Sequence, residues 1–107
     1  MKLVLAVVQD NDAGRLIEYL TEKKFGVTKL SSTGGFLKSG NTTLMIGVDE
    51  ERLDELMGII EKICRPRKQV VTPFPGGHGD TYVPYPIEVS VGGATVFVMN
   101  VERFEKI

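Results

Sequence analysis

Runs of hydrophobic and polar positions along the chain predict a strand followed by an amphipathic helix at the N-terminal end. The segment Leu3–Val8 is apolar without alternation and rich in β-branched residues, which predicts a buried strand. From Asn11 to Phe25, apolar residues recur three and four positions apart. This period, after the capping residues Asp10–Asp12, predicts a helix that Gly26 stops.

The next stretch repeats the pattern with two strands and a second helix. Val27–Ser32 mixes polar and apolar residues like a half-exposed strand, and Thr42–Val48 is apolar like a central strand. Asp49 is the expected N-cap of a helix that Pro66 ends. The apolar stripe of this helix consists of Leu53, Leu56, Met57, Ile60, Ile63 and Cys64.

Residues 65–85 contain several prolines and glycines and are predicted to form a long loop. The alternating segment Ile87–Val91 and the apolar segment Ala94–Val101 are predicted strands. Gly92–Gly93 between them is typical of a two-residue hairpin turn.

This order of elements predicts an α+β fold. It matches the split βαβ, ferredoxin-like plan βαββαβ, with an extra C-terminal hairpin strand, in a single domain over residues 1–107. The first and third strands of that plan lie in the middle of the sheet, and here those two are the most apolar. Both helices cover one sheet face, so the other face carries either the side chains of Leu3, Leu5 and Val7 or those of Val4, Ala6 and Val8. Such an apolar face has to be covered, which predicts a homo-oligomer.

Composition excludes several classes of protein. With 107 residues and a net charge of −1, the chain lacks the basic excess expected of a nucleic-acid-binding surface. Its one cysteine, Cys64, falls on the apolar helix stripe and is expected in the core. No apolar run is long enough for a membrane span, and no secretory leader is visible, so a cytoplasmic location is expected.

The glycine-rich segment Ser32–Thr43, between two predicted strands, is the first candidate site. Its glycines leave backbone amides open to an anion, but Asn41 stands where a P-loop has lysine and a strand follows instead of a helix. The remaining donors are the backbone of Gly35–Leu37, the Asn41 amide, the Thr28 and Ser39 hydroxyls and the Lys38 ammonium. Two interpretations remain open: a turn that covers a nucleotide-like ligand, or an apolar hairpin tip buried in an oligomer contact.

The other polar residues give weaker signals. His78 beside Asp80 supplies too few ligands for a metal and is expected to be a solvated loop residue. Tyr82–Pro86 fits either a partner-docking strip or a rigid lead into the next strand. No set of nucleophile and base is recognisable, so no enzyme activity, metal or cofactor is expected.

Several segments together resemble the PII-like cyclic-di-AMP receptor family of Gram-positive bacteria. They are Val7–Asp10, Val27–Leu30, Thr33–Thr43, Tyr82–Pro86 and Val91–Val98. The resemblance implies a ferredoxin-like homotrimer that binds cyclic di-AMP in clefts between subunits and signals to a downstream protein without catalysis. It also implies that residues 33–41 correspond to a T-loop and residues 65–85 to a B-loop that rearranges on binding.

The resemblance implies a role for each matching residue. The Thr28 hydroxyl binds a phosphate, and Gly35, Phe36 and Leu37 offer backbone amides, the latter two also packing on adenine. The Asn41 amide reads an adenine edge, and the Gly47 backbone meets the base.

One departure concerns a phosphate contact, because family members carry arginine where this chain has Gly26. Either Lys29 or Lys38 replaces that charge or the affinity is lower. The competing functions are an ATP-binding PII-like regulator of a transporter and, less favoured, a nucleotide hydrolase.

Overall fold

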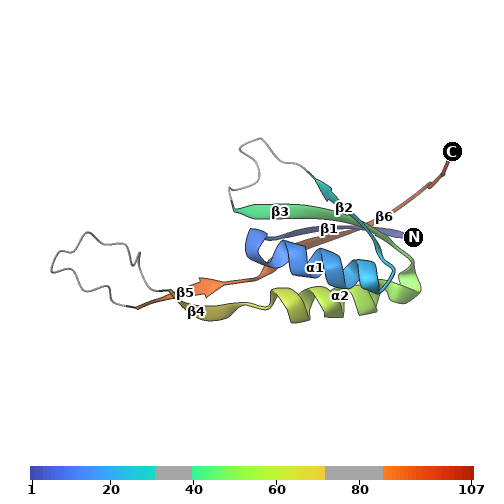
Figure 1. Cartoon of the computed structure of the whole chain (residues 1–107). Coiled ribbons are helices and arrows are strands. Elements are labelled where there is room, and N and C mark those ends of the chain that lie inside the picture. The colour runs from blue at the N-terminus through green and yellow to red at the C-terminus, as the bar shows by residue number, and fades with distance from the viewer. Residues whose placement is uncertain (31–39, 72–85) are drawn as a thin grey trace.

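We describe the chain from a computed structural model, which defines residues 1–30, 40–71 and 86–107 (Figure 1). The elements in chain order are β1 (Lys2–Gln9), α1 (Asp10–Glu22), β2 (Gly26–Leu30), β3 (Asn41–Val48), α2 (Glu50–Cys64), β4 (Arg67–Val71), β5 (Ile87–Val91) and β6 (Ala94–Asn100).

Four strands form one antiparallel sheet in the order β2-β3-β1-β6, and β4 and β5 form a separate antiparallel pair. Both helices lie on the same side of the four-stranded sheet (Figure 1). This arrangement confirms the α+β class and is compatible with the ferredoxin-like plan. As predicted, the first and third strands are central, because β1 pairs with both β3 and β6, and β3 pairs with both β1 and β2.

The predicted loop over residues 65–85 is wrong in part, because Arg67–Val71 is a strand that pairs with Ile87–Val91. The predicted hairpin across Gly92–Gly93 is also wrong, since β5 pairs with β4 whereas β6 pairs with β1. Both glycines have φ of 89° and carry the chain from one sheet to the other instead of reversing it. The strand that closes the main sheet is therefore β6. The paired β4 and β5, called here the β4–β5 hairpin, extend beyond the ends of the helices (Figure 1).

The first helix starts and stops earlier than its sequence predicts. Gln9 is its N-cap, and Asp10 already lies in the first turn. The helix ends at Glu22, three residues before Phe25, and Lys24 rather than Gly26 takes the positive φ of 66° that reverses the chain. Phe25 follows as a buried residue of the core, just before the chain enters β2.

The core fills the space between the helices and one face of the sheet. It combines alternate residues of β1 and β3 with the apolar stripes of both helices. Its fully buried large members are Leu16, Leu20, Leu44, Ile46, Leu56, Val4 and Val8. Cys64 is 1% exposed, which confirms its predicted place in the core. Burial at this scale stabilises the fold by about 2 kcal/mol for each large side chain.

Candidate ligand-binding site

The sheet face opposite the helices, called here the open face, carries alternate residues of all four strands. Val4, Ala6 and Val8 are buried against the helices, so Leu3, Leu5 and Val7 point to the open face. The pairing of the strands extends this face into three cross-strand rows. They are Gly26–Gly47–Leu3–Met99, Thr28–Met45–Leu5–Phe97 and Leu30–Thr43–Val7–Thr95.

Three of the predicted ligand residues lie on this open face. Thr28 pairs with Met45, and Gly47 lies two residues further along β3. Asn41 is the first residue of the same strand and pairs with Gln9. All three have solvent access, with Thr28 and Gly47 exposed and Asn41 partly buried. At about 3.4 Å per residue, Asn41 lies roughly 14 Å from the row of Thr28 and roughly 20 Å from Gly47. One protomer therefore presents these residues along a surface and does not gather them into one pocket.

The backbone at Asn41 is fixed by its two neighbours. Asp10 N–H donates a 2.8 Å hydrogen bond to the Gly40 carbonyl, and Thr42 Oγ1 donates a 2.5 Å hydrogen bond to Asp10 Oδ1. Gly40, with φ of 94°, makes the turn into the strand possible. These contacts hold the backbone on both sides of Asn41 at a defined place at the end of the sheet.

Two hollows meet at Asn41, and both also include Gln9. One, of about 380 Å³, reaches toward Gly92 and β6, and the other, of about 410 Å³, reaches toward the first turn of α1. Gln9 Oε1 accepts a 2.7 Å hydrogen bond from Gly92 N–H, which orients the Gln9 amide next to Asn41. Gln9 is thus a candidate site residue that the sequence analysis did not single out. The sequence signal for Gln9 was a polar residue at the end of a buried strand. That end of the sheet is also where Asn41 begins the neighbouring strand.

The departure at Gly26 leaves open space on this face. A Cβ added at Gly26 would meet nothing within 4 Å, and Gly47 lies opposite it on β3. Lys29, one of the two lysines expected to make up for the arginine, does not lie on this face. It pairs with Leu44, and its side chain therefore points to the helix side of the sheet.

The other candidates of the glycine-rich turn lie outside the described residues, as does His78; they are Gly35, Phe36, Leu37, Lys38 and Ser39. Within residues 1–30, 40–71 and 86–107, no group of three or more His, Cys, Asp or Glu side chains is placed to hold a metal ion. Neither helix of that part of the chain combines the length and the apolar character needed to cross a membrane.

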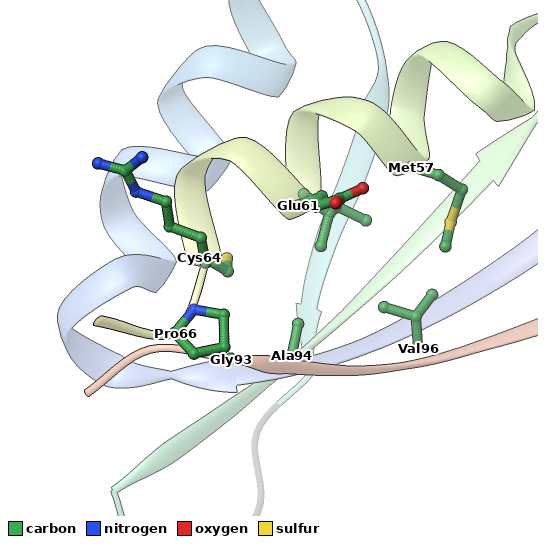
Figure 2. Close-up of a pocket in the computed structure, with 9 residues that line it drawn as sticks. Met57, Glu61, Cys64, Pro66, Gly93, Ala94 and Val96 are labelled. Atoms are coloured by element: carbon green, nitrogen blue, oxygen red, sulfur yellow. The ribbon is translucent and has the colours of Figure 1, made fainter. Parts of the chain in front are cut away.

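A further hollow of about 390 Å³ lies on the helix side, between the end of α2 and β6 (Figure 2). Met57 from the helix and Val96 from the strand flank it. Cys64 also lines it, but burial, with a smaller contribution from the charge of Asp12, raises the pKa of this thiol from 9.0 to about 11. The thiol therefore stays protonated at neutral pH and is no nucleophile.

Comparison with known proteins agrees with the predicted family. One solved structure similar to this chain is that of a functionally unknown protein from Pediococcus pentosaceus ATCC 25745, with 48% sequence identity and a TM-score of 0.80. The similarity covers 99% of this chain and 96% of that one. The family described as "Cyclic-di-AMP receptor" matches residues 1–107, the whole chain. The sequence, the fold and the family match together show that this protein belongs to the cyclic-di-AMP receptor family.

Proposed function

We propose that the protein is a signal-transducing receptor that binds cyclic di-AMP in clefts between the subunits of a homotrimer, without catalytic activity. The observation that carries the proposal is the placement of Thr28, Asn41 and Gly47 along one open sheet face. Spread over roughly 20 Å, these residues form one wall of a site. A neighbouring subunit supplies the second wall.

The apolar character of the open face supports the assembly. Phe97 is 53% exposed and Met99 39% exposed, next to Leu3 and Leu5 in the adjacent strand. A contiguous apolar surface on a sheet is unfavourable in water, and contact with other copies removes it. The same contact brings the edge of a second subunit to Thr28 and Gly47.

The chemistry of the proposed site suits a cyclic dinucleotide. A hydroxyl at Thr28 and backbone amides at Gly35, Phe36 and Leu37 bind the phosphates. The Asn41 amide reads an adenine edge, and the Gly47 backbone lies against the base. Amides and hydroxyls hold such a dianion in a chain of net charge −1 if they are preorganised, because less conformational freedom is then lost on binding.

Signalling in this proposal is a shift between two arrangements of the segments at residues 33–41 and 65–85, the second of which includes β4. The ligand favours the arrangement that it binds more tightly, and a partner protein recognises it. The β4–β5 hairpin is close to the site, because Gly92 at its end donates a hydrogen bond to Gln9, the neighbour of Asn41.

Isothermal titration with cyclic di-AMP tests the ligand. We expect saturable binding by the wild type and a loss of roughly tenfold in Asn41→Ala, the effect of one hydrogen bond to a base. Asn100→Ala is the matched control, because its side chain lies on the helix side with Lys2 and should change affinity less than about twofold. If the wild type shows no binding, cyclic di-AMP is excluded as the ligand. If ATP displaces cyclic di-AMP when the ATP concentration is the lower of the two, the alternative function as an ATP-binding regulator is favoured.

Analytical ultracentrifugation tests the assembly. We expect a species of three times the 11.8 kDa chain mass. Phe97→Lys should dissociate it while the protomer stays folded, because Phe97 contributes little to the core. Val70→Lys, at an exposed apolar position on the β4–β5 hairpin, should leave it intact. A monomeric wild type at micromolar concentration contradicts the proposal.

A further inference from the structure

A basic hollow of about 450 Å³ lies away from the open face, where the end of α2 meets the start of β4. It is lined by Arg15, Lys62, Ile63, Arg65 and Arg67, so four of its five residues are cationic. Arg15 comes from α1, and Arg67 is the first residue of the β4–β5 hairpin. None of these side chains belongs to the proposed cyclic-di-AMP site.

Two of the guanidinium groups are held in place by one buried carboxylate. Asp12 has a fully buried side chain, and its Oδ1 lies 2.7 Å from Arg67 Nη2 and 3.2 Å from Arg15 Nη2. The same Arg15 nitrogen donates a 3.0 Å hydrogen bond to the Ile63 carbonyl, and Arg67 Nη1 donates one of 3.2 Å to the Arg65 carbonyl. Both guanidinium groups are therefore fixed before any partner arrives, which lowers the entropic cost of binding.

The positive charge of the hollow exceeds what Asp12 compensates. Asp12 balances only one of the two arginines that it contacts. Lys62 and Arg65 are exposed and form no ion pair within the described part of the chain. The chain as a whole has a net charge of −1, so this positive surface is local and is not a reflection of composition.

We infer that this hollow docks an acidic segment of a partner protein. Guanidinium groups pair with carboxylates through two parallel hydrogen bonds, and the partly buried Ile63 offers an apolar contact among the charges. The best donors of Arg15 and Arg67 already serve Asp12, so the remaining charge is spread along α2 and β4 and does not converge on one point. A row of carboxylates fits such a distribution better than a single small anion.

The position of the hollow fits the partner of a receptor, and in this respect the inference rests on the proposed function. The hollow lies on the helix side and stays accessible when other copies cover the open face. Arg67 also belongs to the β4–β5 hairpin, so a change in the hairpin moves one side of the docking surface. A partner bound here therefore senses the hairpin without touching the nucleotide.

The test is fluorescence anisotropy with a labelled glutamate-rich peptide and its glutamine counterpart as probes. We expect the double variant Lys62→Glu/Arg65→Glu to lose at least about tenfold in affinity for the glutamate peptide, with weaker binding at higher salt. Lys24→Glu/Lys106→Glu makes the same change in net charge away from the hollow and should lose less than about twofold. Thermal unfolding checks that both variants fold.

Equal losses in the two double variants, or equal affinity for the two peptides, overturn the docking surface. Saturable binding of pyrophosphate without binding of the glutamate peptide also overturns it, in favour of a small-anion site. Titration of the wild type with cyclic di-AMP separates the two proposals. A wild type that binds the peptide but no cyclic di-AMP refutes the receptor function alone, and the reverse result refutes the docking surface alone.

Discussion

Arg67 Nη2 lies 2.7 Å from Oδ1 of Asp12, so the first residue of the β4–β5 hairpin is tied to the first turn of α1. The Asp12 carboxylate is fully buried. A buried charge that loses its partner is strongly destabilising, whereas an exposed ion pair contributes little.

Arg67→Ala should therefore lower the urea midpoint of unfolding roughly threefold more than Arg103→Ala does. The comparison is matched because Arg103 also forms an ion pair, with Glu105 at 2.8 Å. In that pair, however, both side chains are exposed. Arg15 remains near Asp12 in the Arg67 variant, which limits the loss. Equal midpoints for the two variants would show that the buried carboxylate does not depend on Arg67.

Gly92→Ala and Gly93→Ala should differ in stability although both glycines have φ of 89°. A Cβ at Gly92 would lie 2.8 Å from Arg67 Nη1 and 3.0 Å from the Cys64 carbonyl, whereas one at Gly93 would meet nothing within 4 Å. The strain of a positive φ costs about 1 kcal/mol in each variant. The overlap at Gly92 should add about 2 kcal/mol. Urea unfolding of both proteins measures the difference, and similar values would contradict the close packing at Gly92.

Stability should fall at alkaline pH because of Cys64. Its thiol has a pKa near 9.0 when unfolded and about 11 in the fold, so the folded state favours the protonated form. This contribution is fully present below pH 9, and it decreases from there to about pH 11, as the unfolded thiol loses its proton first. Urea unfolding of the wild type and of Cys64→Ala across this range isolates it. A slope that is the same in both proteins would refute the assignment to Cys64.

Gly26→Arg should tighten cyclic di-AMP binding by roughly tenfold, the effect of a charge-assisted hydrogen bond to a phosphate. The substitution fits because the position is open and its backbone φ is ordinary for any residue. Titration calorimetry measures the change. Gly26→Gln, a neutral side chain of similar reach, is the control for contact without charge. An arginine variant no tighter than the glutamine variant would place the phosphates elsewhere.

The central sheet and the helices were predictable because their signals are strong. The uninterrupted apolar run at β1 indicates a central strand, and the stripe that ends at Cys64 indicates a helix with one buried face; the structure has both. The choice between the two faces of β1 was left open by the sequence. It needed the positions of the helices, which bury Val4, Ala6 and Val8.

The errors have a common cause in pairing between distant segments. The strand Arg67–Val71 exposes almost every side chain and has no buried face, so it shows no period of two. Gly92–Gly93 has the composition of a hairpin turn, but the pairing of β6 with β1 overrides it. Gln9 was missed as a site residue because its role depends on Gly92, which is 83 positions away along the chain.

Because β4 and β5 pair only with each other in the described part of the chain, the hairpin can tilt as one unit without breaking a ladder of the main sheet. Such a tilt requires backbone rotation only where the chain enters the hairpin, at Pro66, and where it leaves the hairpin, at Gly92–Gly93. The resistance to it comes from polar contacts of Arg67 with Asp12 and Gly92 with Gln9, and from the hydrogen bond that Gly93 N–H donates to the Cys64 carbonyl. Of these contacts, the one from Gln9 can be removed without leaving a buried charge unpaired, so substitution at Gln9 is the change expected to loosen the hairpin at the smallest cost in stability.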